Sequence, residues 1–480
     1  MRKAVQVRNA LFLVRNGAFH CSSKGFFTGS KYIDEESRIS PQHQHDAKEH
    51  VSDMFRWSKE ATIYVHWPYC KSLCSFCNFN KYVREFIDHE RMKKCLVKEC
   101  KSLLEISGAK TINSVYFGGG TPSLAKPSTF SAILECLQQK GVLNPNAEVT
   151  LEANPTSAES HKLRDFKTAG INRLSLGVQS LSEDELAVLG RQGSCLESLK
   201  SLDMAKVLFP GRVSVDLMFG RPKQTAPEWE RELEEILPLC DNHISIYQLT
   251  LHRGTSLFRQ VQEGKLVVPD SDQMADLYLT TVDVLEKAGF YQYEVSNFAK
   301  PVSDTGYMSS ILFLDVFDYQ HGCESQHNLS YWRGVPYIGI GPGAHGRFYE
   351  MSDKDSKMKR VAWVQTLEPN SWMKEVEEFG HGTRKKVFQS NAVILEEIIM
   401  LGLRTSEGIP NERFNHYITA TSSGSLREIF EGCSDVRDFM AEGLLQLDER
   451  GLRATPSGLA VVDTLTASIA LHLEKYLKQS

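Results

Sequence analysis

From about residue 61, short apolar runs alternate with segments whose apolar positions recur at helical spacing. Short apolar runs predict buried strands, and spacings of three and four residues predict amphipathic helices. The predicted strands are 62–67, 114–117, 148–153, 173–179, 212–219 and 243–250. The predicted helices are 88–106, 128–139, 182–189, 197–208, 227–239 and 272–288. Six consecutive strand–helix units predict an α/β fold, a partial or closed parallel barrel with helices outside and chemistry at the strands' carboxyl ends.

Beyond this alternation, the pattern predicts two further regions. A middle region, 301–385, mixes aromatic, glycine-rich and polar segments, and the last part, 386–480, has mostly helical periodicity. A hairpin is expected at 444–447 and 452–454, and helices with one hairpin indicate a small winged-helix-like domain. The predicted organisation is therefore a leader and linker at 1–55, the barrel at 56–300, the middle region and the C-terminal domain.

The first 33 residues contain six lysines and arginines, and the first acidic residue is Asp34. An acid-free, arginine-bearing start with nearby serines is typical of an organellar transit peptide. We therefore predict import into mitochondria, with the matrix as the destination, although a disordered basic tail would have the same composition. Losing these six bases would take the net charge from −5 to −11. An acidic body argues against nucleic acid as a partner.

The remaining composition is that of an ordinary globular chain, with 41% hydrophobic and 24% charged residues. No apolar run is long enough to predict a transmembrane helix. Eleven cysteines scattered over 480 residues do not form a secreted disulfide framework. They suit a reducing compartment and a few functional thiolates.

Three of these cysteines, Cys70, Cys74 and Cys77, stand at C-x3-C-x2-C spacing directly after the first predicted strand. Three close thiolates can bind one face of a 4Fe–4S cluster and leave its fourth iron open to another ligand. The alternative is a zinc site with His66 as fourth ligand. Zinc sites usually contain a second cysteine pair, which this segment lacks.

The motif Tyr64-x-His66-x-Pro68-x-Cys70 resembles the radical S-adenosylmethionine (SAM) superfamily, from about Tyr64 to the end of the chain. Within it, the chain resembles the branch of oxygen-independent coproporphyrinogen III oxidase and the HemW heme chaperones. The resemblance implies that SAM binds the open iron of the cluster. Phe76 is placed to pack on the adenine ring, or else is a core residue of its loop.

Polar groups at the ends of the predicted strands match the superfamily's SAM contacts. Gly118, Gly119 and Gly120 with Thr121 follow the second strand, where glycines allow a ligand close to the backbone and free N–H groups can bind its carboxylate. Each polar residue alone would be a solvated or ion-paired rim residue. Taken together, these residues match the family's pattern. The resemblance therefore implies SAM contacts at Tyr64, Gly119, Gly120, Thr121, Glu152, Gln179, Arg191 and Asp216. The family usually has leucine where this chain has Arg221, so Arg221 is assigned no role.

Two features separate an oxidase from a heme carrier. The oxidases have a fourth cysteine where this chain has Phe79, which cannot supply a thiolate. The segment His327-Asn-x-x-Tyr331-Trp332 resembles a HemW motif associated with heme, and histidine beside aromatics can bind heme iron. About twenty residues, roughly 302–323, are inserted before it, either a lineage-specific loop or a gene-model artefact.

These observations predict a mitochondrial heme chaperone that delivers heme to an acceptor hemoprotein, with His327 as a heme ligand. The sequence identifies neither that acceptor nor an electron donor. The alternatives are oxidative decarboxylation of coproporphyrinogen III and a radical SAM enzyme acting on RNA or protein. Whether SAM is cleaved, and so whether the chain is an enzyme, stays open at this level.

Overall fold

The computed structural model describes residues 59–156, 161–191, 193–301, 322–352, 355–418 and 424–479. The predicted transit peptide and most of the 302–323 insertion lie outside the described residues. No helix within the described ranges is both long enough and apolar enough to cross a membrane.

Seven parallel strands form the centre of one sheet, in the order β11-β1-β4-β5-β6-β7-β8. They are β1 (Glu60–Trp67), β4 (Thr111–Gly119), β5 (Leu143–Ala153), β6 (Arg173–Gln179), β7 (Val213–Phe219), β8 (His243–Gln248) and β11 (Tyr337–Ile340). The first six are the predicted strands, so the α/β prediction is confirmed. The seventh, β11, follows the insertion and pairs with β1.

Antiparallel strands extend this sheet at both ends. Next to β8 lie β10 (Asn297–Ala299) and β9 (Tyr291–Glu294), and next to β11 lie β12 (His345–Met351), β13 (Met358–Gln365) and β14 (Thr383–Phe388). The middle region thus contributes four strands to the barrel sheet. The sheet curves strongly, but its order ends at β14 and β9, so the barrel is partial.

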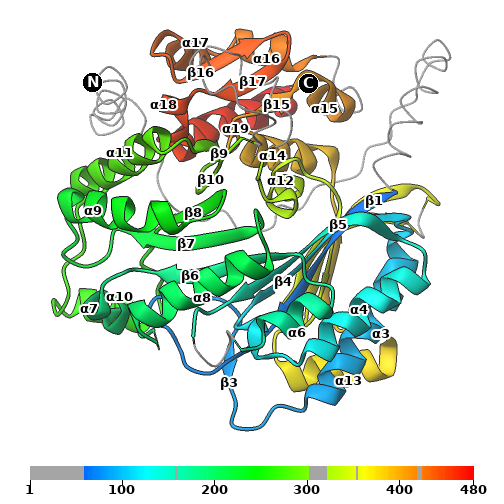
Figure 1. Cartoon of the computed structure of the whole chain (residues 1–480). Helices are drawn as coiled ribbons and strands as arrows, with labels where there is room; N and C mark the ends of the chain where they lie inside the picture. The colour runs from blue at the N-terminus through cyan, green and yellow to red at the C-terminus, as the bar shows by residue number, and fades with distance from the viewer. Residues whose placement is uncertain are drawn as a thin grey trace.

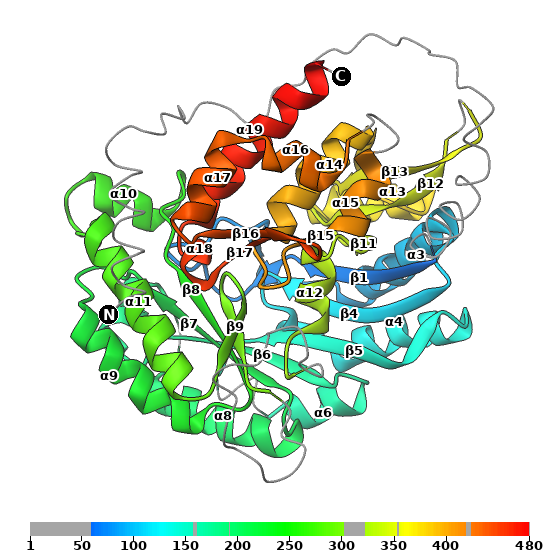
Figure 2. The ribbon, with the colours of Figure 1, turned by 90° about the horizontal axis from the view of Figure 1, so that it is seen from above.

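Helices cover the convex face of the curved sheet (Figures 1 and 2). They are α3 (His89–Ser107), α4 (Pro127–Gln139), α6 (Leu163–Thr168), α7 (Glu183–Val188), α8 (Cys195–Leu208), α9 (Ala226–Ile236), α10 (Ser256–Gln262), α11 (Ser271–Lys287) and α13 (Pro369–Phe379). Helix α3 begins where the Asp88 side chain accepts a hydrogen bond from the Arg91 amide, and ends at Gly108, whose φ is 63°. Its apolar face, including Met92, Leu96 and Leu103, is buried in the main core. Burial of such side chains stabilises each by roughly 1.5–3 kcal/mol.

The C-terminal domain has a separate core. It contains α14 (Asn391–Gly402), α15 (Asn411–Ile418), α16 (Leu426–Glu431), α17 (Ser434–Ala441), α18 (Pro456–Leu459) and α19 (Val462–Gln479), with β15 (Ile409–Pro410), β16 (Leu445–Asp448) and β17 (Gly451–Ala454). The predicted hairpin is β16–β17, and β15 pairs with its second strand. A backbone bridge between Glu294 and Thr405 joins this domain to the barrel.

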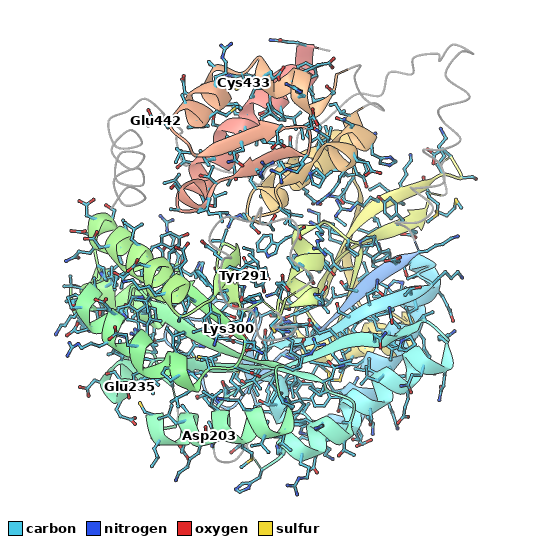
Figure 3. The ribbon with its side chains drawn as sticks, turned by 45° about the horizontal axis from the view of Figure 1, so that its top comes forward. Asp203, Glu235, Tyr291, Lys300, Cys433 and Glu442 are labelled. Atoms are coloured by element: carbon cyan, nitrogen blue, oxygen red, sulfur yellow. The ribbon has the colours of Figure 1, made fainter. Side chains whose placement is uncertain are left out.

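Side chains divide the barrel into an outside and an inside (Figure 3). Asp203 on α8 and Glu235 on α9 lie on the exposed outer layer, whereas Tyr291 lies toward the centre. One short helix, α12 (Gln326–Trp332), packs against β4 on the concave side. It carries the predicted heme motif to the inside of the barrel.

Candidate functional site

The loop that carries the three cysteines is fixed to the rim of the barrel at two places. Cys70 ends β2 (Tyr69–Cys70), which pairs with β3 (Tyr82–Val83). The Ser75 amide donates to the carbonyl of Leu189 at 2.9 Å, and its hydroxyl donates to the carbonyl of Val188 at 2.8 Å. These bonds join the loop to the end of α7, so the cysteines are held at the carboxyl ends of the strands.

The three thiols are free and half-buried. Burial raises the pKa of Cys70, while a hydrogen bond from Thr121 lowers it and the thiols of Cys77 and Cys74 raise it further. Within the described ranges, no three histidine, cysteine or carboxylate side chains converge closely enough for a single metal ion. Three neighbouring thiols on one loop, without a second cysteine pair, suit a 4Fe–4S cluster better than a zinc ion. The residues therefore fit a 4Fe–4S cluster.

The glycine run lies directly against this loop. An added Cβ at Gly120 would come within 2.9 Å of the Pro68 carbonyl carbon and the Tyr69 oxygen, and Gly119 has a φ of 113°. The expected free amides have partners here, because Gly120 donates to Trp67 and Thr121 to Tyr69, at 2.7 and 2.9 Å. Because these glycines have no side chains, the cysteine loop can pack directly against the end of β4.

Two predicted carboxylates lie inside the barrel near this loop. Glu152 accepts from the Tyr116 hydroxyl at 2.9 Å and from the Gly119 amide at 3.1 Å. Burial and the nearby Asp216 together raise its pKa to about 7, against the lowering effect of these hydrogen bonds. Burial also raises the pKa of Asp216 to about 6, although Ser175 donates to it at 2.7 Å. These carboxylates are poised to exchange protons or bind cations near neutral pH.

Gln179 and Arg191, twelve residues apart in sequence, meet beside Gly177. An added Cβ at Gly177 would lie 3.1 Å from the Gln179 amide nitrogen and 3.2 Å from the Arg191 guanidinium. Arg191 donates to the Asn154 side chain at 2.7 Å and approaches the Cys74 sulfur at 3.6 Å. Gln179 has a φ of 71°, a strained conformation for a residue with a side chain. Such strain is concentrated at functional sites.

A cavity of about 670 Å³ opens at this rim. Its lining includes the predicted residues Tyr64, Gly119 and Glu152, and also His66 and Phe79, which is 65% exposed. Phe76, in contrast, packs against Leu189, Met218, Leu249 and Leu257. The His66 ring is bonded to the Tyr64 hydroxyl at 3.1 Å and to the Asn80 carbonyl at 2.8 Å. Burial lowers the pKa of His66 to about 4, so its ring is neutral.

His327 lies deeper in the barrel and is only 2% exposed. Its Nδ1 is 2.8 Å from the Ser114 hydroxyl, its ring stacks on Tyr116 at 4.8 Å, and Tyr331 lies 5.0 Å away. Burial lowers its pKa to about 3, which leaves the imidazole neutral. Its Nε2 is buried without a hydrogen-bond partner in the part of the chain that the structure describes. A neutral imidazole with one unpaired nitrogen can coordinate a metal ion that reaches that nitrogen.

Helix α12 is held in place by residues that the sequence did not point to. Glu148 on β5 accepts hydrogen bonds from the His327 amide at 3.1 Å and the Ser325 hydroxyl at 3.3 Å. Arg173 on β6 pairs with the same carboxylate at 3.3 Å. Ser114 is 213 residues from His327, and no spacing pattern connects such distant positions.

Arg221, the departure from the family pattern, is 1% exposed and forms a buried ion pair with Glu232. A second ion pair, to Glu185, measures 2.8 Å. Its guanidinium also lies 5.5 Å from the centre of the Trp229 ring. Arg221 therefore joins α7 and α9 beneath the rim.

Comparisons with known proteins agree with this arrangement. Residues 64–236 match the model of the radical SAM superfamily, and residues 389–461 match the HemN C-terminal domain. The solved coproporphyrinogen III oxidase HemN of Escherichia coli superposes with a TM-score of 0.67, covering 88% of this chain and 93% of HemN. At 19% identity, that likeness shows the fold alone.

Relatives in other organisms are more similar in sequence. The mitochondrial radical S-adenosyl methionine domain-containing protein 1 of Danio rerio is 46% identical over 417 residues, 87% of this chain and 88% of the relative. Its Mus musculus counterpart is 47% identical, over 87% of this chain and 89% of the relative. The heme chaperone HemW of Bacillus subtilis is 28% identical, over 83% of this chain and 96% of the relative.

Membership of this superfamily implies a 4Fe–4S cluster and SAM, and the free thiols of Cys70, Cys74 and Cys77 fit the cluster. When bound, these groups supply one-electron chemistry at the SAM sulfonium. The chain belongs to the radical SAM superfamily, in the HemW-like family of the mitochondrial radical S-adenosyl methionine domain-containing protein 1, with a HemN C-terminal domain.

Proposed function

We propose that this protein is a mitochondrial heme chaperone that binds heme through His327 and delivers it to an acceptor hemoprotein. The observation that carries the proposal is the buried, neutral His327 ring, whose Nε2 has no partner among the described residues. An unpaired buried nitrogen costs free energy, so its retention is consistent with a ligand that it meets. The relatives named as heme chaperones and as mitochondrial proteins support the cargo and the location.

Heme can reach His327 only if the aromatic cover moves, since Tyr116 and Tyr331 pack against the ring. Tyr331 also lines the rim cavity, so its rotation would connect that cavity to Nε2. We infer that Tyr331 is the side chain that rotates, because Tyr116 is held by its bond to Glu152.

The first experiment is a hemin titration of the anaerobically reconstituted protein, followed by absorbance. We expect a Soret band that is lost in His327→Gln, which keeps a polar side chain of similar size but is a poor iron ligand. The matched control is His161→Ala, because His161 is exposed and lies in the turn that leads into α6. An unchanged Soret band and heme affinity in His327→Gln would refute the assignment.

The second experiment separates a carrier from an oxidase. A carrier transfers bound heme to apomyoglobin without chemical change, whereas the oxidase converts coproporphyrinogen III to protoporphyrinogen. The exposed Phe79, at the position of the oxidases' fourth cysteine, favours the carrier. Protoporphyrinogen formation at many turnovers would establish the oxidase instead.

We also propose that SAM occupies the rim cavity, with contacts to Tyr64, Glu152, Gln179, Arg191 and Asp216. The support is that Tyr64 and Glu152 line this cavity, and that Asp216 is close enough to Glu152 to raise its pKa. Arg191 approaches the Cys74 sulfur and lies beside Gln179. Asp216→Asn should weaken SAM binding in equilibrium dialysis while the reconstituted iron content stays unchanged. Equal binding by the variant would remove Asp216 from the contact set.

A further inference from the structure

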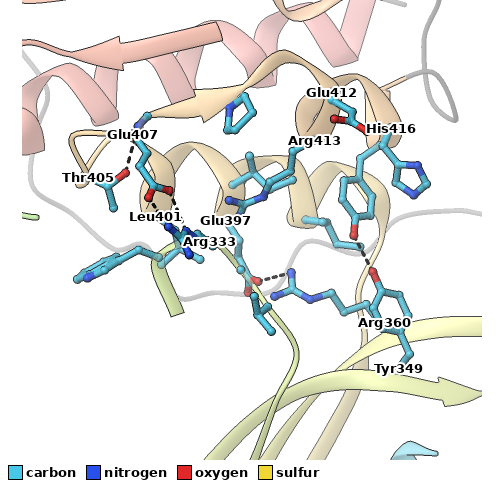
Figure 4. Close-up of a pocket in the computed structure, with 18 residues that line it drawn as sticks. Arg333, Tyr349, Arg360, Glu397, Leu401, Thr405, Glu407, Glu412, Arg413 and His416 are labelled. Atoms are coloured by element: carbon cyan, nitrogen blue, oxygen red, sulfur yellow. Dashed lines mark hydrogen bonds and ion pairs between the residues drawn. The ribbon is translucent and has the colours of Figure 1, made fainter. Parts of the chain in front are cut away.

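A second cavity, of about 360 Å³, lies between the barrel and the C-terminal domain. It is bounded by the end of α12, by β12 and β13, and by α14 and α15 (Figure 4). Apolar side chains form much of its wall, namely Trp332, Val335, Ile394, Ile398 and Leu401. A concave apolar site with a few polar groups at a domain boundary is the usual form of a small-molecule pocket.

The wall of this cavity contains three arginines and three glutamates, namely Arg333, Arg360, Arg413, Glu397, Glu407 and Glu412. Arg333 pairs with Glu407 and Arg360 pairs with Glu397 at 2.9 Å. Glu397 is already shared, because Arg347 from β12 also pairs with it, at 3.0 Å. Glu407 and Glu397 are therefore both engaged by other arginines, and neither forms an ion pair with Arg413.

Arg413, on α15, lines the same cavity, and no carboxylate of the described residues lies within ion-pairing distance of it. Figure 4 draws no contact to its guanidinium. Glu412, its neighbour in sequence, also lines the cavity, is exposed and forms no ion pair with it. Burial lowers the pKa of Arg413 to about 10, against the raising effect of nearby Tyr417 and Glu407, so the guanidinium remains charged at neutral pH.

The guanidinium of Arg413 packs closely against the backbone that follows α12. Gly334 follows α12 with a φ of 64°, and a Cβ there would overlap Nη2 of Arg413. The absence of a side chain at 334 thus makes room for the Arg413 guanidinium in the wall of this cavity. A partly buried guanidinium that lacks an ion-pair partner among the described residues is available to bind an anionic ligand.

We propose that this cavity binds an apolar carboxylic acid, with Arg413 as the partner of its carboxylate. The planar guanidinium can bind a carboxylate through two parallel hydrogen bonds, while the apolar wall takes the rest of the ligand. Two sources have this chemistry, an aliphatic acid and the propionate edge of a porphyrin. The site lies outside the rim cavity and does not depend on the heme proposal.

The test uses the full-length reconstituted protein and two pairs of probes in isothermal titration calorimetry. Decanoate is compared with decanol, and hemin with hemin dimethyl ester. We expect one of the two acids to bind, and Arg413→Met to weaken that acid about tenfold, or about 1.4 kcal/mol, without affecting its neutral partner. Arg437→Met is the matched control, because Arg437 is exposed and lies in the same domain.

A measurement on the unaltered protein covers the case that Arg413→Met does not fold. Phenylglyoxal modification of Arg413, followed by mass spectrometry, should slow in the presence of the bound acid. The proposal is overturned if neither acid binds, if Arg413→Met binds the acid as tightly as the parent protein, or if the acid gives no protection.

These outcomes are independent of those for the heme proposal. Heme binding that requires His327 but not Arg413, with no binding of decanoate, would overturn this inference and leave the chaperone proposal intact. Binding of decanoate through Arg413 without any Soret band would support this inference and overturn the heme proposal.

Discussion

The Ser114 hydroxyl on β4 lies 2.8 Å from Nδ1 of His327 on α12, while Nε2 of the same ring has no partner among the described residues. If the hydroxyl accepts from Nδ1–H, the lone pair is on Nε2, which is the form that binds iron. Ser114 is thus a positioning residue for the proposed heme ligand.

Ser114→Ala should lower heme affinity about tenfold. Losses of this size are typical when a residue that hydrogen-bonds to a metal ligand is removed. The Soret band should shift as well, because the ring loses its fixed orientation and tautomer. Hemin titration checks both, with Ser102→Ala on the outer helix α3 as control. A Soret band identical to that of the parent protein would show that Ser114 serves packing alone.

Gly120→Ala should prevent cluster assembly. The new Cβ would meet backbone atoms of Pro68 and Tyr69 at 2.9 Å, and backbone cannot move aside as a flexible side chain can. Iron content after anaerobic reconstitution should fall, since the displaced segment leads directly into Cys70.

The control for this variant is Gly432→Ala, where the nearest atoms are 3.8 Å or more from the added Cβ. Gly432 has a helical φ of −74°, so alanine fits its conformation. Full iron content in Gly120→Ala would mean that the cysteine loop does not need its present contact with β4.

Arg221→Leu should destabilise the protein by about 3–5 kcal/mol, because it removes a fully buried guanidinium and leaves the largely buried Glu232 without its ion-pair partner. Glu185 would lose its ion pair as well. Urea unfolding measures the loss, and Arg231→Leu on the exposed side of α9 is the control. Unchanged stability combined with lost SAM binding would instead place Arg221 in the cofactor site.

Glu99 on α3 should make stability depend on pH. It accepts from the amides of Gly341 and Gly382 at 2.7 and 2.8 Å and from the Trp372 indole at 3.0 Å, and burial raises its pKa to about 7. Between the ordinary glutamate value of 4.5 and about 7, the folded protein keeps a proton that the unfolded chain has lost. Stability should therefore fall as pH rises through this interval.

Urea unfolding between pH 4.5 and 8 measures this dependence, and the slope should be smaller in Glu99→Gln, which cannot ionise. Glu99→Gln should also be less stable throughout, by about 1–3 kcal/mol, since one of the two acceptor oxygens becomes a donor that faces N–H groups. An equal slope in both proteins would assign the dependence to other buried carboxyls.

The sequence by itself determined the features that are local. Cys70, Cys74 and Cys77 lie in one loop after one strand, so their spacing alone indicated a cluster. The alternation of strands and helices determined the parallel α/β core, because each element's periodicity reports which of its faces is buried. The hairpin β16–β17 was predictable for the same reason.

Only the tertiary structure decided the contacts between distant segments. The pairing of β11 with β1, the bond from Ser114 to His327, the ion pairs of Arg221 and the unpaired charge of Arg413 carry no signal in local spacing. Each depends on closing a long stretch of chain, and that closure is stabilised by the combined burial of many side chains. The cysteine loop could therefore be predicted from the sequence, whereas the surroundings of His327 and the cavity at Arg413 could not.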